Sequence, residues 1–257
     1  MLKNIFSTIY EYFFNKDYFR EKIGFITHEI GDFKVGQLGN VNDINRYLFL
    51  KLRKERLWPI GHHLVEYNED DLFDIIEFCH DNISKPTVIY TFDELNKIDY
   101  DSQTAQDEFR VMLNPHLKDY GEGFSLDSNG FIIKNPDFGL EQIFDAKVMA
   151  DDVRIKNPLE YAIEKFRNRN SSFEDRREAV RNLADVLEYL RPSIKDEMLP
   201  KDEKDLFYIA NNFNIRHNNE MQKSDYNGVW LNWIFYLFLS TIHAITRTIN
   251  QAEGGQH

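Results

Sequence analysis

The most hydrophobic segment of the sequence, Val229 to Ile245, constrains the fold more than any other feature. Polar residues interrupt it, and its longest unbroken apolar run, Trp233 to Leu239, is much shorter than the about 20 apolar residues that a membrane-spanning helix needs. A helix that is apolar over most of its surface has to be covered by other elements. We therefore expect a core helix that begins near Trp230; a membrane helix is the alternative.

Other segments repeat apolar residues at the three- and four-residue spacing of amphipathic helices. These segments are residues 16–31, 42–56, 69–80, 105–117, 158–169, a helix that follows a capping box at Ser171–Glu174 and ends near Arg191, and 206–213. Asn129-Gly130 stands between two apolar runs, which predicts a β-hairpin near residues 123–133. The sequence thus predicts a mainly α fold, with a mixed helical N-terminal region over residues 1–150 and a helical bundle over residues 151–257.

Charge is distributed unevenly along the chain. The formal net charge of the 257 residues is -12, which argues against a broad, non-specific nucleic-acid binder. Residues 1–150 hold 16 basic and 26 acidic residues, whereas residues 151–257 hold 15 and 17, so the acidity belongs to the first region. We expect the N-terminal region to face solvent or a protein partner, and the C-terminal region has room for a small phosphate-binding surface.

Several motifs of known chemistry are missing from the sequence. It has no glycine-rich phosphate loop and no His-Glu-x-x-His helix. The single cysteine, Cys79, excludes an internal disulfide and a multi-cysteine zinc site, and its position on an apolar helical side predicts a packed thiol. Met1 to Phe14 lacks the cleavage pattern of a secretory signal, so we expect a cytoplasmic protein without a membrane anchor, metal or cofactor.

A polar segment between the last two expected helices carries the best candidates for chemistry. Arg216 supplies a permanent, planar cation that suits phosphate, and the imidazole of the adjacent His217 titrates near neutral pH. Together they could cleave RNA without a metal: the imidazole would move the proton of a ribose 2′-hydroxyl or of the leaving oxygen, and the guanidinium would stabilise the phosphorane. The alternative is a solvated loop whose polar side chains cap helices.

The helix Asp175–Leu190 and the later Ile215-Arg216-His217, followed by a long apolar helix, resemble HEPN-superfamily domains. The similarity is greatest to the C-terminal domains of bacterial abortive-infection proteins and covers roughly residues 158–250. It implies an all-α, often dimeric bundle whose active members are metal-independent endoribonucleases of antiviral defence or toxin type. In that family a histidine usually follows the arginine after four to six residues, whereas here the two are adjacent, so an active site could require two such pairs across a dimer axis.

The resemblance also implies roles for individual residues. Arg216 would be the phosphate and transition-state cation and His217 the general acid and base, with RNA, including tRNA, as the substrate and a second copy of the chain as the partner. Supporting polar groups would be Glu188, Asn212, Gln222, Asp225 and Tyr226. Two alternatives stay open: a non-catalytic HEPN-like module that senses or scaffolds protein partners, and a nucleotide-binding regulator.

Two further groups in the C-terminal region have a structural and a functional interpretation. His243 would be a hydrogen-bonded core or interface histidine, with a second catalytic imidazole as the alternative. The arginine-dense helix face at Arg176, Arg177 and Arg181 alternates with acidic residues, which predicts a solvated face with ion pairs; an RNA-binding track is the alternative.

Overall fold

A computed structural model describes residues 1–26, 32–89, 97–136, 140, 143, 152–212 and 228–254. The chain divides into two compact units, Met1–Asn135 (unit 1) and Pro136–His257 (unit 2). The described residues form ten helices and three two-stranded antiparallel hairpins, which confirms the mainly α class. The boundary predicted at residues 150/151 lies C-terminal to this division, in a stretch outside the described residues.

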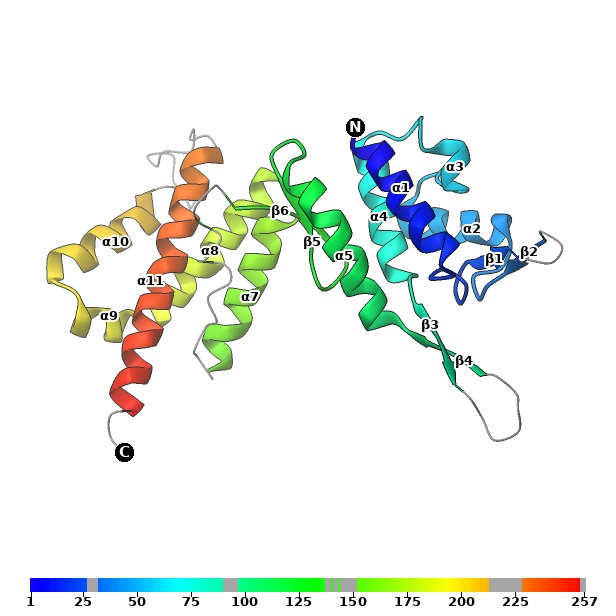
Figure 1. Cartoon of the computed structure of the whole chain (residues 1–257). Coiled ribbons are helices and arrows are strands. Elements are labelled where there is room, and N and C mark those ends of the chain that lie inside the picture. Colours follow the sequence, from blue (N-terminus) through cyan, green and yellow to red (C-terminus); the bar gives the residue numbers. More distant parts are fainter. Residues whose placement is uncertain are drawn as a thin grey trace. The chain divides into compact units, whose positions relative to one another are not determined.

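The longer helices of unit 1 lie close together (Figure 1), and one face of each contributes side chains to its core. Apolar residues at three- and four-residue spacing produce these faces; in the first helix they are Leu2, Phe6, Ile9 and Phe13, all buried. The helices are α1 (Leu2–Asn15), α2 (Val41–Leu52), α3 (Ile60–His63), α4 (Glu69–Asp81) and α5 (Ser102–Lys118).

The three hairpins all belong to unit 1. They pair β1 (Gly24–Ile26) with β2 (Phe33–Val35), β3 (Lys85–Ile89) with β4 (Lys97–Asp101), and β5 (Phe124–Leu126) with β6 (Ile132–Lys134). The last is the predicted hairpin, but its turn differs from the tight Asn-Gly turn that the sequence suggests. Leu126 pairs with Ile132, so residues 127–131 form a longer loop. Of these loop residues only Gly130 has a positive φ, of 86°.

The helix predicted over residues 16–31 is wrong. Asp17 adopts a left-handed conformation with φ of 62°, which ends the helical path after α1, and turns lead into β1. Phe19 and Ile23, whose spacing suggested a helix, are buried from these turns instead. Gly24 at the start of β1 lies so close to β2 that a Cβ atom would be 2.2 Å from the Lys34 carbonyl oxygen.

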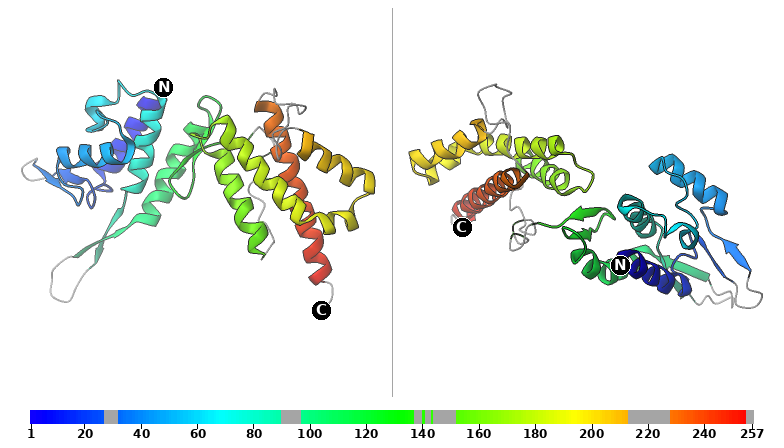
Figure 2. Two further views of the ribbon diagram at one scale, coloured as in Figure 1. Left: turned by 180° about the vertical axis from the view of Figure 1, so that it is seen from behind. Right: turned by 90° about the horizontal axis from the view of Figure 1, so that it is seen from above.

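The elements of unit 2 that the structure describes are all helices. They are α7 (Val153–Arg167), α8 (Phe173–Tyr189), α9 (Arg191–Glu197), α10 (Pro200–Asn212) and α11 (Gly228–Gly254). Helices α7 and α8 lie side by side, and α11 packs on α8 (Figures 1 and 2). Phe166 of α7 and Phe235 of α11 stack with ring centroids 3.8 Å apart, so α11 is the predicted core helix. By length and composition alone α11 could also cross a membrane over Gly228–Gln251.

Local polar signals fix where the helices of unit 2 begin. The predicted capping box occurs one residue later than expected: Ser172 Oγ accepts from the amide of Asp175, whose carboxylate accepts from the amide of Ser172. Helix α7 begins five residues before Pro158, since Asp152 accepts a hydrogen bond from the Arg154 amide and acts as its N-cap. The proline is therefore inside the helix rather than at its start.

Candidate functional site

Most of the predicted catalytic segment lies outside the described residues. This holds for Arg216, His217, Gln222, Asp225 and Tyr226, which fall within residues 213–227. Asn212 is the last residue of α10, and its side chain is likewise outside the description. The structure thus positions the two helices that precede and follow the segment, and the assignment of these residues stays a prediction.

Glu188 is part of an ion-pair network that joins three helices of unit 2. Its Oε2 accepts from Nη1 of Arg191 at 3.3 Å, and Nε of the same arginine donates to Glu203 Oε1 at 2.7 Å. Glu203 is buried, with 5% of the residue exposed, and the guanidinium also lies over the Phe207 ring at 4.2 Å. The hydrogen bond to Glu203 raises the pKa of Arg191. These contacts give Glu188 a structural role at the junction of α8, α9 and α10.

The surroundings of His243 agree in part with its interpretation as a hydrogen-bonded core or interface histidine. It is half-buried in α11 and hydrogen-bonded to the backbone of Ile143, and its buried Nε2 has no hydrogen-bond partner among the described residues. Burial lowers its pKa, because the charged imidazolium is harder to hydrate there.

Two other predictions about side chains can be compared with the structure. Cys79 is fully buried, and burial raises the pKa of its thiol, so it is the packed cysteine that its helical position predicts. On α8, Arg177 Nη1 donates to Glu174 at 2.8 Å, as expected for a face with ion pairs. Within the described ranges no three His, Cys, Asp or Glu side chains are grouped to hold a metal ion.

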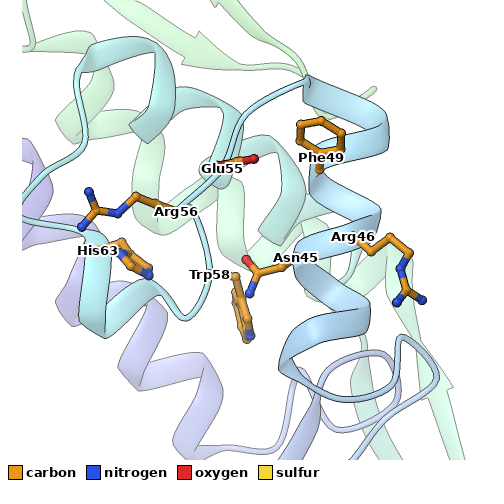
Figure 3. A pocket seen from close by; sticks show the side chains of 7 residues that line it. All are labelled: Asn45, Arg46, Phe49, Glu55, Arg56, Trp58 and His63. Carbon is orange, nitrogen blue, oxygen red and sulfur yellow. The ribbon is translucent and has the colours of Figure 1, made fainter.

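A pocket in unit 1, which the sequence analysis missed, collects polar and aromatic side chains (Figure 3). It has a volume of about 370 Å³ and lies between α2, the segment that follows it, and α3. Its lining residues are Asn45, Arg46, Phe49, Glu55, Arg56, Trp58 and His63. We refer to it as the α2–α3 pocket.

The backbone after α2 turns sharply to form this pocket. Helix α2 ends at Leu52; Arg53 caps it with a left-handed φ of 58°, and Arg56 follows with φ of 62°. Left-handed residues other than glycine are unfavourable and persist where the surrounding packing fixes them. Here Trp58 supplies that packing, since it is 6% exposed and its ring lies 6.0 Å from that of Phe78 on α4. The turn brings Arg56 and His63 to the same side of the pocket (Figure 3).

Ion pairs with α4 neutralise two cations of the basic stretch that borders the pocket. Lys51 contacts Asp81 at 2.7 Å, and Lys54 contacts both Asp71 at 3.0 Å and Asp74 at 2.7 Å. These lysines do not line the pocket. The stretch therefore serves mainly to attach α2 to α4, rather than to form a continuous basic track.

The two arginines of the pocket are much more accessible. Arg46 is 72% exposed and contacts Asp43 only at 3.7 Å, and Arg56 is 69% exposed and pairs with Glu66 at 3.0 Å. The pocket also has an apolar lining residue, Phe49, whose aromatic ring is exposed as well. The arrangement can bind a small ligand that combines a flat ring with an anionic group.

One sequence signal could have pointed to this pocket. Helix α2 buries Ile44 and Leu48 on one side, yet it also carries Tyr47, Phe49 and Leu50, which are exposed. Apolar side chains on both sides of a short surface helix exceed what its packing needs. Arg56 and His63 join this helix in one pocket only because the backbone turns at residues 53–56. No sequence motif predicts that turn.

The comparisons with known proteins add no relative: no family model matches the sequence, and neither a curated protein nor a solved structure matches it.

Proposed function

We propose that this protein is a metal-independent endoribonuclease of the toxin or phage-defence type, with Arg216 and His217 as its catalytic pair. The observation that carries the proposal is the adjacency of a permanent cation and an imidazole in a polar segment between two helices of a helical unit. Support also comes from charge, since residues 151–257 are nearly balanced whereas residues 1–150 are strongly acidic. The region that contains Arg216 and His217 therefore repels the RNA phosphates less than the acidic N-terminal region does.

The proposed reaction is an internal transesterification. His217 takes the proton of a ribose 2′-hydroxyl, the 2′-oxygen bonds to phosphorus, and the bond from phosphorus to the 5′-oxygen breaks. The leaving oxygen takes a proton from an imidazolium, and a second copy of the pair in a dimer would supply it. The products are a 2′,3′-cyclic phosphate and a 5′-hydroxyl end, and Arg216 stabilises the negative charge of the intermediate.

The test compares the purified chain with its His217→Ala and Arg216→Ala variants on total RNA and tRNA in the presence of EDTA. We expect cleavage with 5′-hydroxyl ends, and a loss of about 100-fold or more in each variant. His116→Ala, which removes an exposed histidine from α5, is the matched control and should cleave normally. Circular dichroism verifies that each variant is folded. Folded variants as active as the wild type, or a wild type that never cleaves, would contradict the proposal.

The second candidate is a non-catalytic module that recognises a small ligand, and the α2–α3 pocket is the observation that favours it. The same experiment separates the two candidates, because a recognition module leaves RNA intact whatever residue stands at position 217.

A further inference from the structure

We infer that the α2–α3 pocket binds a nucleoside 5′-phosphate, either as a free nucleotide or as the 5′ end of an RNA strand. The inference does not depend on cleavage by Arg216 and His217, since the pocket belongs to unit 1 and shares no residue with them. Three features of the pocket carry it: an aromatic wall, a hydrogen-bonding amide and the accessible guanidinium group of Arg56.

The aromatic wall fits a nucleobase. Phe49 is 42% exposed, so a face or edge of its ring is open to a ligand, and the buried Trp58 forms an apolar floor close to Asn45 (Figure 3). Nucleobases stack on aromatic side chains regardless of sequence, because every base has a π-face. A purely aliphatic ligand would leave the polar half of the lining unsatisfied.

The polar groups beside this wall fit the edge of a base and a ribose. The Asn45 carboxamide offers a donor and an acceptor together, the combination that pairs with the edge of adenine. Glu55 is exposed at the rim and can accept from an amino group or a ribose hydroxyl.

The Arg56 guanidinium fits the phosphate. The Arg46 side chain extends from the other side of α2, away from Arg56 and His63, so Arg56 is the cation on the His63 side of the pocket (Figure 3). Its pair with Glu66 joins two exposed side chains, 69% and 55% accessible. Exposed pairs of this kind contribute little to stability, so Arg56 can exchange the carboxylate for a phosphate, to which it can bind with two parallel hydrogen bonds.

The size of the pocket limits the ligand to about one nucleotide. Its volume of about 370 Å³ is near the lower end of the range for small-molecule sites, roughly 300–1,000 Å³. The lysines that would extend a basic track from it are paired with α4. A long stretch of RNA backbone would therefore find few further cations here, which favours a mononucleotide unit over a polymer groove.

The experiment is isothermal titration calorimetry on the full chain. The probes are AMP, GMP, CMP and UMP, with adenosine and inorganic phosphate as partial ligands, followed by one short RNA with a 5′-phosphate or a 5′-hydroxyl. The RNA titrations use the His217→Ala variant so that the probe is not cut. We expect at least one 5′-phosphorylated probe to saturate at about 1 mM or below, and to bind more tightly than either partial ligand.

Pocket variants then locate the binding. Phe49→Ala and Arg56→Ala should each weaken the affinity about tenfold or more, because they remove the stacking surface and the phosphate cation. Their controls are Val111→Ala and Lys118→Ala, which remove an exposed apolar and an exposed basic side chain from α5, and these should bind like the wild type.

Both kinds of saturation support the proposal. Saturation by free nucleotides identifies the ligand as a soluble nucleotide, whereas saturation by 5′-phosphorylated RNA alone identifies it as the 5′ end of an RNA strand. Three results would overturn it: no saturable binding by any phosphorylated probe, equal affinity for inorganic phosphate, or binding that the pocket variants leave unchanged.

Discussion

The two units use pairs of arginine and glutamate in different ways. In unit 1 the pair Arg56–Glu66 lies at the rim of a pocket, and its side chains are 69% and 55% exposed. In unit 2 the pair Arg191–Glu203 lies at a helix junction, and its carboxylate side chain is 7% exposed. The residue types and the distances of 3.0 Å and 2.7 Å are similar, so burial makes the difference.

This difference teaches which charges are available for binding. An exposed pair is hydrated in either state and can exchange its partner for a ligand at little cost. A carboxylate that folding has removed from water needs its own cation permanently, because nothing else compensates its desolvation. We therefore look for ligand binding at the exposed pair of unit 1 and for structural dependence at the buried pair of unit 2.

The largest effect we expect tests whether the two units have separate cores. Phe235→Ala removes a fully buried ring that stacks on Phe166, which should lower the free energy of unfolding of unit 2 by about 3–5 kcal/mol. Hydrogen exchange should accelerate in α7, α8 and α11 while the amides of α1 and α5 keep their protection. Leu199→Ala, at a residue that is 70% exposed, should change stability by less than about 0.5 kcal/mol. Equal acceleration in α1 would show a shared core.

The second prediction compares the two ion pairs directly. Arg191→Met keeps most of the side-chain volume but leaves the Glu203 carboxylate buried without its cation, so we expect a loss of about 2–3 kcal/mol. Arg56→Met makes the same chemical change at an exposed pair and should cost less than about 1 kcal/mol. Urea denaturation measures both.

A further substitution identifies the cause of that loss. If the unpaired carboxylate is responsible, Glu203→Gln added to Arg191→Met should recover part of the stability, since a neutral amide is easier to bury. Equal losses for the two arginine variants, or no recovery, would contradict the distinction between the units.

The third prediction concerns a feature that the units share. Asn68 caps α4 and Ser172 caps α8, each in a capping box with the acidic residue three positions later. Alanine at either position should cost about 1 kcal/mol, because an amide of the first helical turn loses its acceptor. Asn68→Ser retains an acceptor and should stay close to the wild type in the same thermal denaturation. Unequal losses at the two caps would show that the surroundings, rather than the cap, set the energy.

Sequence patterns predicted the long helices well, since their amphipathic spacing and their caps are local. Helices α4, α5 and α8 and the core helix α11 all follow from such spacing. The hairpins β1–β2 and β3–β4 escaped prediction, because strands of three and five residues are too short to show a clear alternation of apolar and polar residues. Residues 16–31 show the same limit. Phe19 and Ile23 are buried, as their spacing predicts, but the left-handed conformation of Asp17 places them in turns instead of a helix.

The sequence predicts the functional sites less completely than it predicts the fold. Composition can single out Arg216 and His217 because both residue types carry chemistry by themselves. The α2–α3 pocket, in contrast, joins Phe49 to Arg56 and His63 through a backbone turn, and none of these residues is unusual alone. Glu188 shows the opposite error. Its sequence position suggested a supporting group of the catalytic site, whereas its carboxylate accepts a hydrogen bond from Arg191 at the junction of α8 and α9.

The smallest effect we expect separates the units by their response to pH. Burial lowers the pKa of His243 below its ordinary value of 6.5, so folded unit 2 takes up a proton less readily than the unfolded chain. The resulting stabilisation is complete above pH 6.5 and is lost as the pH falls towards the lowered pKa of the folded state. His243→Gln removes the titrating group, so the stability of unit 2 should fall less between about pH 7 and pH 5 than in the wild type.

Hydrogen exchange of the α8 and α11 amides, measured at each pH, reports unit 2 specifically. His116→Gln changes an exposed histidine of unit 1 and should leave the pH dependence of these amides as it is in the wild type. The assignment fails if His243→Gln keeps the wild-type pH dependence, since another group would then be responsible for the acid sensitivity of the bundle.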